Sequence, residues 1–452
     1  MAKIIVIGGV AAGMSAAAQA KRCGGDNEVI VCEKGGHISY GACGLPYFVG
    51  NEKQEYTDLL ALTPEKALVQ KGVKAFTYRE AARIDIARRN VTVKNLETGA
   101  LSEEKYDSLI IATGACSYLP PVEGIGSKGV YTLRTLEDGI RLKQFINENK
   151  PNTAHIIGEG HIALEAAEVF RQRGVEHITL SVSGRHLCWW LDEDIAALIE
   201  EEAARNRVEI LKTPAPKGIS RVDGGMKISY ADFTREAEFV FVSRGMKPNT
   251  ALAEQAGIRL DKRGAIDVDN YCATSAEGVF AAGDCANVYN YVTKEKMYFP
   301  RGTIANRQGR AAGYNAAGVK TEYKGTCAPV VFKFFSIEAG RTGLTAAEAK
   351  RRGLDAESVL IKSVTKPGYY PGGSRIYVKL TCDRATGKLL GAQIAGGETS
   401  AKKIDLLSAA LYNEMTIEEL KNIDFAYAPP FSPVWDPVLT AAGRLSKIIK
   451  NR

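Results

Sequence analysis

The strongest constraint on the fold is a strand–glycine turn–helix–strand unit that occurs twice, about 150 residues apart. The first copy reads KIIVIGG, VAAGMSAAAQAKR and NEVIVCEK, and the second reads TAHIIGEG, HIALEAAEVFRQRG and VEHITLSV. Apolar runs of strand length on either side of a glycine turn and a helix are typical of a parallel βαβ unit. The repeat therefore predicts an α/β chain with two Rossmann-like dinucleotide-binding domains.

Length and charge fit a multidomain globular chain with small-molecule partners. At roughly 150 residues per domain, the 452 residues predict about three domains. The net charge of +7 suits phosphate-bearing ligands, whereas no dense basic run with interleaved aromatics indicates a nucleic acid. The apolar opening is short and interrupted by glycines, so we expect neither a membrane segment nor a signal peptide.

The nine cysteines are scattered through the chain and are never spaced C-x-x-C. An odd, scattered set of this kind indicates neither a disulfide framework nor a zinc site, so no metal is expected. It fits a reducing compartment, and we expect a cytoplasmic protein.

The first repeat carries a degenerate dinucleotide motif. Gly8 allows a tight turn and Gly13 lets the helix pack closely, so that the helix N-terminus meets a pyrophosphate. Glu33 stands 20 residues past Gly13, at the end of the second strand, where a carboxylate binds ribose hydroxyls. The expected cofactor contacts of this unit are Gly8, Val10, Ala11, Ala12, Gly13, Glu33 and Lys34.

The second repeat differs in the acid that should follow its second strand. That strand ends LSVSGRH, with no carboxylate and with Arg185 close by. This is the arrangement that tolerates a 2′-phosphate, so Ser183 and Arg185 predict a preference for NADPH over NADH. A solvated loop role for Arg185 is the alternative. The other contacts expected in this unit are Gly158, Gly160, His161 and Ile162.

Two further segments complete the outline. GVFAAGDCANV, residues 278–288, is a short apolar strand that ends at Gly283 and Asp284. Asp is a frequent helix N-cap, but downstream of two nucleotide units Asp284 is better interpreted as a cofactor contact. From about Lys324 the strands VVFKFF and SRIYVKLTC and the helix KKIDLLSAALYNE predict a C-terminal α+β domain.

One cysteine stands out from the other eight. Cys43 lies in HISYGACGLPYFVG, framed by Gly41, Gly44 and Pro46. A reactive thiol needs a partly exposed, electropositive setting such as a helix start. An inert buried thiol is the alternative.

Together these motifs resemble a known family. ATGA at 112–115, GVFAAGDC at 278–285 and YAPPFS at 427–432, with the two repeats, look like the flavin-dependent pyridine nucleotide–disulfide oxidoreductases. SYGACGLPY at 39–47 resembles their single-cysteine branch, which contains coenzyme A-disulfide, coenzyme A-persulfide and polysulfide reductases and NADH oxidases and peroxidases. Two-cysteine members have a second cysteine five positions later, where this chain has Phe48. Cys43 therefore needs an external partner, a small thiol or oxygen.

The resemblance covers essentially the whole chain and implies its domains and cofactors. An FAD-binding domain would comprise 1–115 and 250–322, an NAD(P)H-binding domain 116–249, and a C-terminal dimerisation domain 323–452. Either NADPH or NADH would donate hydride to FAD. Further implied cofactor contacts are Ala112, Thr113, Gly114, Glu165, Gly245, Gly283 and, at the flavin ribityl chain, Asp284.

The resemblance also implies a catalytic set. Cys43 would form a mixed disulfide with coenzyme A, and Tyr427 and Tyr369, with Tyr370 as a possible substitute for the latter, would protonate the departing thiolate. A homodimer would place these tyrosines over the cysteine of its partner. Implied coenzyme A contacts are Gln19, Arg22, Ser39 and Lys71, although Ala42 stands where that group commonly has Asn.

Three functions stay open at this point. The chain is expected to reduce coenzyme A disulfide, persulfide or polysulfide. An NAD(P)H oxidase or peroxidase using a cysteine sulfenic acid is the second candidate, but the histidine that acts on the sulfenate in such relatives is Ala11 here. The third is a non-enzymatic, flavin-bound thiol redox sensor.

Overall fold

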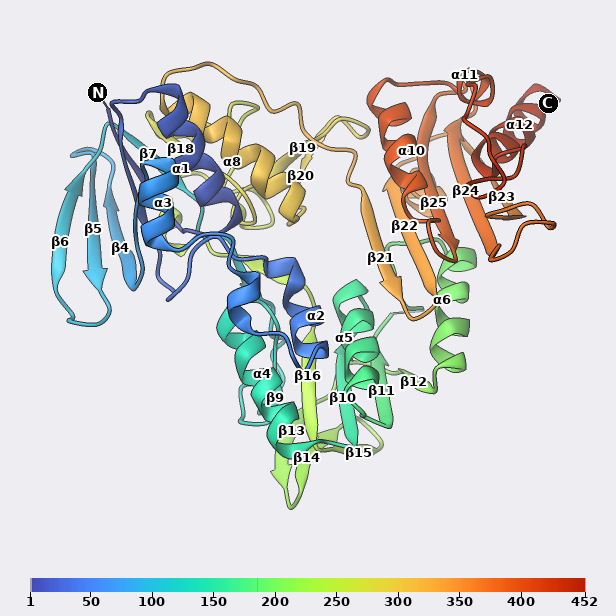
Figure 1. Ribbon diagram of the computed structural model, residues 1–452, viewed down its shortest axis with the longest axis horizontal. Helices are drawn as coiled ribbons and strands as arrows, with labels where there is room; N and C mark the ends of the chain where they lie inside the picture. Colours follow the sequence, from blue (N-terminus) through green and yellow to red (C-terminus); the bar gives the residue numbers. More distant parts are fainter. Residues whose placement is uncertain (1, 185, 452) are drawn as a thin grey trace.

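The first repeat forms a five-stranded parallel sheet at one end of the molecule (Figure 1). The computed structural model describes residues 2–184 and 186–451. The strand order is β18-β7-β1-β2-β3, with the central strand β1 paired to β2 in the register Ile7↔Cys32. The elements are β1 (Lys3–Ile7), α1 (Ala11–Cys23), β2 (Glu28–Cys32), β3 (Lys74–Phe76), β7 (Ser108–Ile111) and β18 (Val279–Ala281).

Helix α8 (Gly302–Ala316) packs against α1 at very close range. A Cβ on Gly309 would lie 2.3 Å from the carbonyl oxygen of Ala12, and one on Gly313 would lie 2.3 Å from that of Ala16. Only glycine allows two helix backbones to approach this closely. The contact ties a late segment of the chain to the first helix of the glycine motif.

The second repeat forms another five-stranded parallel sheet, in the order β12-β11-β10-β16-β9. Two antiparallel strands, β8 (Ala115–Ser117) and β17 (Met246–Pro248), lie side by side where the chain enters and leaves this region. The strands and helices are β9 (Val130–Tyr131), α4 (Leu136–Asn149), β10 (Thr153–Gly158), α5 (His161–Gln172), β11 (His177–Val182), α6 (Glu193–Arg205), β12 (Val208–Lys212) and β16 (Phe239–Ser243).

The C-terminal region is an antiparallel sheet covered by helices. Its order is β21-β22-β25-β24-β23, and alternate residues of β21 are buried. The elements are β21 (Val330–Phe334), β22 (Ile337–Gly343), α9 (Ala346–Arg351), β23 (Ala356–Val364), β24 (Arg375–Asp383), β25 (Leu389–Gly396), α10 (Lys403–Tyr412), α11 (Ile417–Lys421) and α12 (Pro437–Lys450).

The remaining elements belong to none of these three five-stranded sheets. Two antiparallel three-stranded sheets are β4 (Arg79–Asp85), β5 (Asn90–Asn95) and β6 (Leu101–Lys105), and β13 (Gly218–Val222), β14 (Gly225–Ser229) and β15 (Thr234–Ala237). The rest are α2 (Leu45–Gly50), α3 (Pro64–Lys71), α7 (Ala251–Gln255), β19 (Val288–Asn290), β20 (Glu295–Met297) and the 3₁₀ turns Ala42–Gly44 and Tyr56–Leu59.

The second sheet and the C-terminal sheet share a hydrophobic core. Phe332 and Phe334 of β21 belong to the same buried cluster as Phe170 of α5. Buried charge also joins the two regions, because Asp192 accepts from the backbone N–H groups of residues 346 and 347 and pairs with Lys379 at 3.1 Å. This packing joins the second sheet to the C-terminal sheet.

The observed architecture confirms the expected fold class, two Rossmann-like α/β domains and a C-terminal α+β domain. The residue boundaries proposed for these domains remain predictions, although the crossing at β8 and β17 lies near two of them. Within the described residues, no helix combines the length and apolar character that a bilayer span requires.

Candidate active site

The glycine turn after β1 forms the first cofactor cradle. Gly8 has φ +100°, and a Cβ there would lie 2.2 Å from the carbonyl oxygen of Ala112. A Cβ on Gly13 would lie 1.7 Å from the carbonyl oxygen of Gly8. Both positions therefore require glycine. No side chain caps the start of α1, so its N-terminus is open to a pyrophosphate.

Glu33 stands where the sequence predicts a ribose-binding acid. Its Oε2 accepts from the Gly9 N–H at 2.6 Å and its Oε1 from the Gly35 N–H at 2.7 Å. Burial raises the pKa of this carboxyl, and the two backbone bonds oppose the rise. By contrast, Lys34 points to Glu80, with which it forms an exposed ion pair at 2.7 Å.

Asp284 follows the edge strand β18 of the same sheet and lies beside this cradle. Its Oδ2 pairs with Arg134 at 2.8 Å, while its Oδ1 is buried and has no hydrogen-bond partner. No helix starts at Asp284, since α8 begins only at Gly302, so the N-cap interpretation is excluded. A buried carboxylate oxygen without a donor fits a ligand hydroxyl, which is what a ribityl chain offers. At neighbouring Gly283, φ is +84° and a Cβ would lie 2.7 Å from that of Ala12.

These residues fit FAD. The glycine turn, Glu33 and Asp284 would hold the pyrophosphate, a ribose and the ribityl chain of the flavin. Thr113 and Gly114 lie at the crossing, where the Thr113 Oγ1 donates to the Asn249 carbonyl at 2.6 Å. Gly114 adopts φ +68° there.

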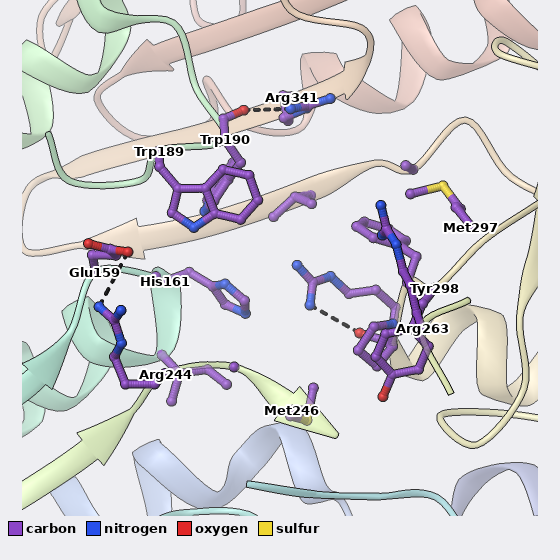
Figure 2. A pocket seen from close by; sticks show the side chains of 18 of the residues that line it. Glu159, His161, Trp189, Trp190, Arg244, Met246, Arg263, Met297, Tyr298 and Arg341 are labelled. Carbon is purple, nitrogen blue, oxygen red and sulfur yellow. Dashed lines mark hydrogen bonds and ion pairs between the residues drawn. The ribbon is translucent and has the colours of Figure 1, made fainter. Parts of the chain in front are cut away.

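The second cradle opens into a cavity of about 790 Å³ at the carboxyl ends of β10 and β16 (Figure 2). A Cβ on Gly158 would meet the Ser243 carbonyl oxygen at 2.4 Å, and Gly245 has φ +100°. Figure 2 shows His161 and Trp189 on facing sides of the cavity. Residues of the cavity wall are Glu159, Gly160, His161, Ile162, Trp189, Arg244, Gly245, Tyr298 and Arg301. Arg185 lies outside the described residues.

Burial strongly shifts the pKa values of two titratable side chains in the first turns of α5. Burial lowers the pKa of His161 to about 3, and the positive charge of Arg301 acts in the same direction. Burial raises the pKa of Glu165 to about 7, against the influence of Arg301. His161 is therefore neutral at physiological pH, and Glu165 titrates near neutrality.

Cys43 is exposed in the 3₁₀ turn that leads into α2. A Cβ on Gly302, the first residue of α8, would lie 3.5 Å from the Cys43 Sγ. Arg301 precedes that glycine and interacts electrostatically with Cys43 and Glu165. The N-terminus of a 15-residue helix and a guanidinium thus provide positive charge beside a sulfur that becomes anionic when it reacts.

The chain offers Cys43 no partner of its own. All nine cysteines are free, and Phe48 is buried in the core with 3% exposure. Six of the other cysteines are buried and Cys23 is half-buried, whereas Cys116 is exposed. Cys43 is therefore not the buried thiol of the alternative interpretation, and its redox role remains a prediction.

Two tyrosines form a pair on the C-terminal domain. The phenol oxygens of Tyr369 and Tyr427 lie 2.9 Å apart, and this hydrogen bond raises the pKa of Tyr427. Tyr369 is 74% exposed and Tyr427 is 44% exposed. Tyr370 instead packs beneath the Lys366 ammonium, 5.5 Å from its ring centre. Of the two candidates, Tyr369 is thus the one that contacts Tyr427.

The four implied coenzyme A contacts lie late in α1, just before the Cys43 turn and at the end of α3. Gln19 is buried in α1 and its Nε2 donates to the Cys23 Sγ at 3.4 Å. Ser39 has φ +48° and donates its N–H to the Gly9 carbonyl at 2.8 Å. Arg22 and Lys71 are exposed at the ends of α1 and α3. Their role in binding coenzyme A remains a prediction.

Sequence reasoning missed three charged residues of the site. Arg134 reaches Asp284 from 150 positions away, and no local pattern signals such a contact. Arg301 directly precedes the helix α8, and Glu159 lies inside the second glycine motif. The positions of both residues in the sequence could therefore have marked them as candidates. Their side-chain directions became visible only in the folded chain.

Two Rossmann-like cradles and an exposed thiol in one chain are the features of a flavin-dependent NAD(P)H oxidoreductase. The family model of the pyridine nucleotide-disulphide oxidoreductases matches residues 2–309, and that of their dimerisation domain matches residues 330–437. The chain belongs to this family, and it is similar to coenzyme A disulfide reductases.

Three curated relatives match nearly the whole chain. The NADH oxidase of Methanocaldococcus jannaschii is 33% identical over 454 residues, which cover 100% of both chains. The NAD(P)H coenzyme A polysulfide/persulfide reductase of Pyrococcus horikoshii is 35% identical over 445 residues, 97% of both chains. The coenzyme A disulfide reductase of Staphylococcus aureus is 30% identical over 433 residues, 96% of this chain and 97% of the other.

Solved structures agree with these matches. A NAD-dependent persulfide reductase from A. fulgidus superposes with a TM-score of 0.95 at 35% identity, covering 99% of this chain and 84% of that one. The chain is therefore an FAD- and NAD(P)H-dependent reductase of the coenzyme A disulfide or persulfide type, or an NADH oxidase.

Proposed function

We propose that the protein reduces coenzyme A disulfide or persulfide with NAD(P)H, using Cys43 as its single redox thiol. The observation that carries the proposal is an exposed thiol beside the α8 N-terminus and Arg301, with the buried Phe48 in place of a second cysteine. A thiol in this setting can exchange only with a sulfur from outside the chain. The names of two relatives, a coenzyme A disulfide reductase and a coenzyme A polysulfide/persulfide reductase, support the same chemistry.

The chemistry balances as one two-electron reduction. The Cys43 thiolate attacks one sulfur of coenzyme A disulfide, which forms a mixed disulfide and expels one coenzyme A thiolate. A phenol of the Tyr369–Tyr427 pair protonates that thiolate. FAD, when bound, supplies the two-electron relay from NAD(P)H that cleaves the mixed disulfide. The sum is NAD(P)H, one proton and one disulfide giving NAD(P)⁺ and two thiols.

The tyrosine pair lies on the C-terminal domain, and we propose that it acts on the Cys43 of a second chain. Tyr369 lies between β23 and β24, and Figure 1 shows these strands on the side of the C-terminal sheet away from α2. Phe431, Val434 and Trp435, which follow Tyr427 in the chain, are 77%, 64% and 76% exposed. An exposed apolar patch of this kind suits an interface. We therefore propose a homodimer in which each chain completes the site of the other.

The proposed activity is tested by the thiol balance. Anaerobic protein with NADH and coenzyme A disulfide should release two thiols per NADH consumed. Cys43→Ser should abolish this release, whereas Cys116→Ser, which removes the other exposed thiol, should not. In addition, the intact mass of the protein should fall by one coenzyme A on reduction, and not in the Cys43→Ser variant.

The oxidase is retained as the second candidate because one relative is an NADH oxidase. NADH consumption that requires oxygen and yields peroxide or water without thiol release would refute the reductase.

The shared site is tested by mixed dimers of Cys43→Ser and Tyr427→Phe chains. Each parent dimer carries a defect in both of its sites. If the sites are shared, each mixed dimer contains one intact site, and activity should return toward about half of the wild-type value. If each chain acted alone, mixing would restore nothing.

A further inference from the structure

Glu159 occupies an unusual place in the second glycine motif. It follows β10 directly and lines the nucleotide cavity, with its side chain only 14% exposed. Its Oε2 accepts from the backbone N–H groups of Ser183 and Gly184, each at 3.0 Å. Its Oε1 lies 3.4 Å from a guanidinium nitrogen of Arg244, which follows β16 on the other side of β10 (Figure 2).

The two repeats allow a residue-by-residue comparison. In the first sheet Ile7 pairs with Cys32, and in the second Ile157 pairs with Ser181. The residue after each pair on the second strand is therefore Glu33 in one unit and Val182 in the other. Val182 is buried and apolar, so the second strand supplies no acid of its own.

A backbone N–H group at the same position nonetheless donates to a carboxylate in both units. Gly35 and Gly184 each stand two residues after the equivalent strand positions. The Gly35 N–H donates to Glu33, and the Gly184 N–H donates to Glu159. In the first unit the acid of the second strand reaches back to the glycine turn; in the second unit an acid of the glycine turn reaches across to the second strand.

We infer that Glu159 is the ribose-binding acid of the second unit, and that it selects NADH over NADPH. An ionised carboxylate accepts at up to about four lone-pair positions, so Oε1 and Oε2 retain capacity for the ribose hydroxyls. A 2′-phosphate at this place would lie beside a carboxylate, and the N–H groups of Ser183 and Gly184 that could bind it are already used. This reverses the preference that the missing acid after β11 suggested.

The inference deepens the proposed function, because it assumes only that NAD(P)H is the electron donor in this cavity. The test uses the FAD-loaded, full-length protein with ferricyanide as electron acceptor, so it does not depend on the disulfide substrate. The variant is Glu159→Gln, which keeps an oxygen for the two backbone N–H groups and removes the charge. Glu176→Gln, an exposed position of the same region, is the matched control.

Wild-type kcat/KM should favour NADH by roughly tenfold or more, the ratio that one hydrogen bond to a charged group sustains. Glu159→Gln should lower that ratio by about the same factor, and Glu176→Gln should leave it unchanged. Quenching of tryptophan fluorescence, with Trp189 at the cavity wall, should show the same order for binding of NAD⁺ and NADP⁺.

A wild-type preference for NADPH, or a ratio that Glu159→Gln leaves unchanged, would overturn the inference. If the variant loses FAD or its fold, the wild-type affinities for 5′-ADP and 2′,5′-ADP decide, and tighter binding of 2′,5′-ADP would refute it. Ferricyanide reduction that prefers NADH in a protein inactive toward coenzyme A disulfide would refute the proposed function alone.

Discussion

The neutral-pH titration of Glu165 gives a prediction whose size follows from the structure. Burial raises the pKa of this carboxyl from 4.5 to about 7. A raised pKa means that the folded chain holds a proton that the unfolded chain releases. The stabilisation from this bound proton is therefore complete below about pH 4.5 and is lost as the pH rises through about 7. Because a pKa difference of one unit corresponds to about 1.4 kcal/mol, the free energy of unfolding should fall by about 3 kcal/mol across this pH range.

Glu165→Gln removes this dependence, because an amide has no proton to lose. The assay is urea unfolding of the FAD-loaded protein at about pH 5 and about pH 8, followed by circular dichroism and flavin fluorescence. The variant should gain stability over the wild type only at the higher pH. Glu176→Gln should follow the wild type at both. An equal difference between variant and wild type at the two pH values would refute the reasoning.

Three further substitutions test the glycine turn after β1, the tyrosine pair, and the junction between the second sheet and the C-terminal sheet. Gly13→Val places a side chain 1.7 Å from the Gly8 carbonyl oxygen, so the purified protein should lack flavin absorbance. Tyr427→Phe breaks the 2.9 Å hydrogen bond to Tyr369 and should slow coenzyme A disulfide reduction roughly tenfold or more, while ferricyanide reduction is unchanged. Asp192→Ala leaves buried groups without their acceptor and should cost roughly 3–5 kcal/mol of unfolding free energy, measured by urea denaturation.

The motifs that depend on backbone geometry could be predicted from the sequence. Gly8 and Gly13 are required by the tight turn and the close helix, and such requirements leave a local pattern. Cys43 was also identifiable, since its frame of small residues and the absence of a cysteine at Phe48 are visible without a structure. The family resemblance pointed to the tyrosines, but only the folded chain distinguished Tyr369 from Tyr370.

Contacts between distant segments could not be predicted in this way. Asp284 meets Arg134 across 150 positions, and Cys43 meets the start of α8 from a segment some 260 residues earlier. A side chain also has a direction that its position in a motif does not fix. Glu159 shows this most clearly, because reading the second strand alone indicated that the ribose acid was missing.

The sequence by itself determined the two βαβ repeats, the C-terminal α+β domain and the absence of a second cysteine five positions after Cys43. These follow from periodicity, glycine positions and spacing, which are local properties of a chain. The tertiary structure decided which charges surround the thiol and which carboxylate accepts from the backbone N–H groups that follow β11. Those depend on parallel strands ending at one edge of a sheet, where residues far apart in sequence come within hydrogen-bonding distance.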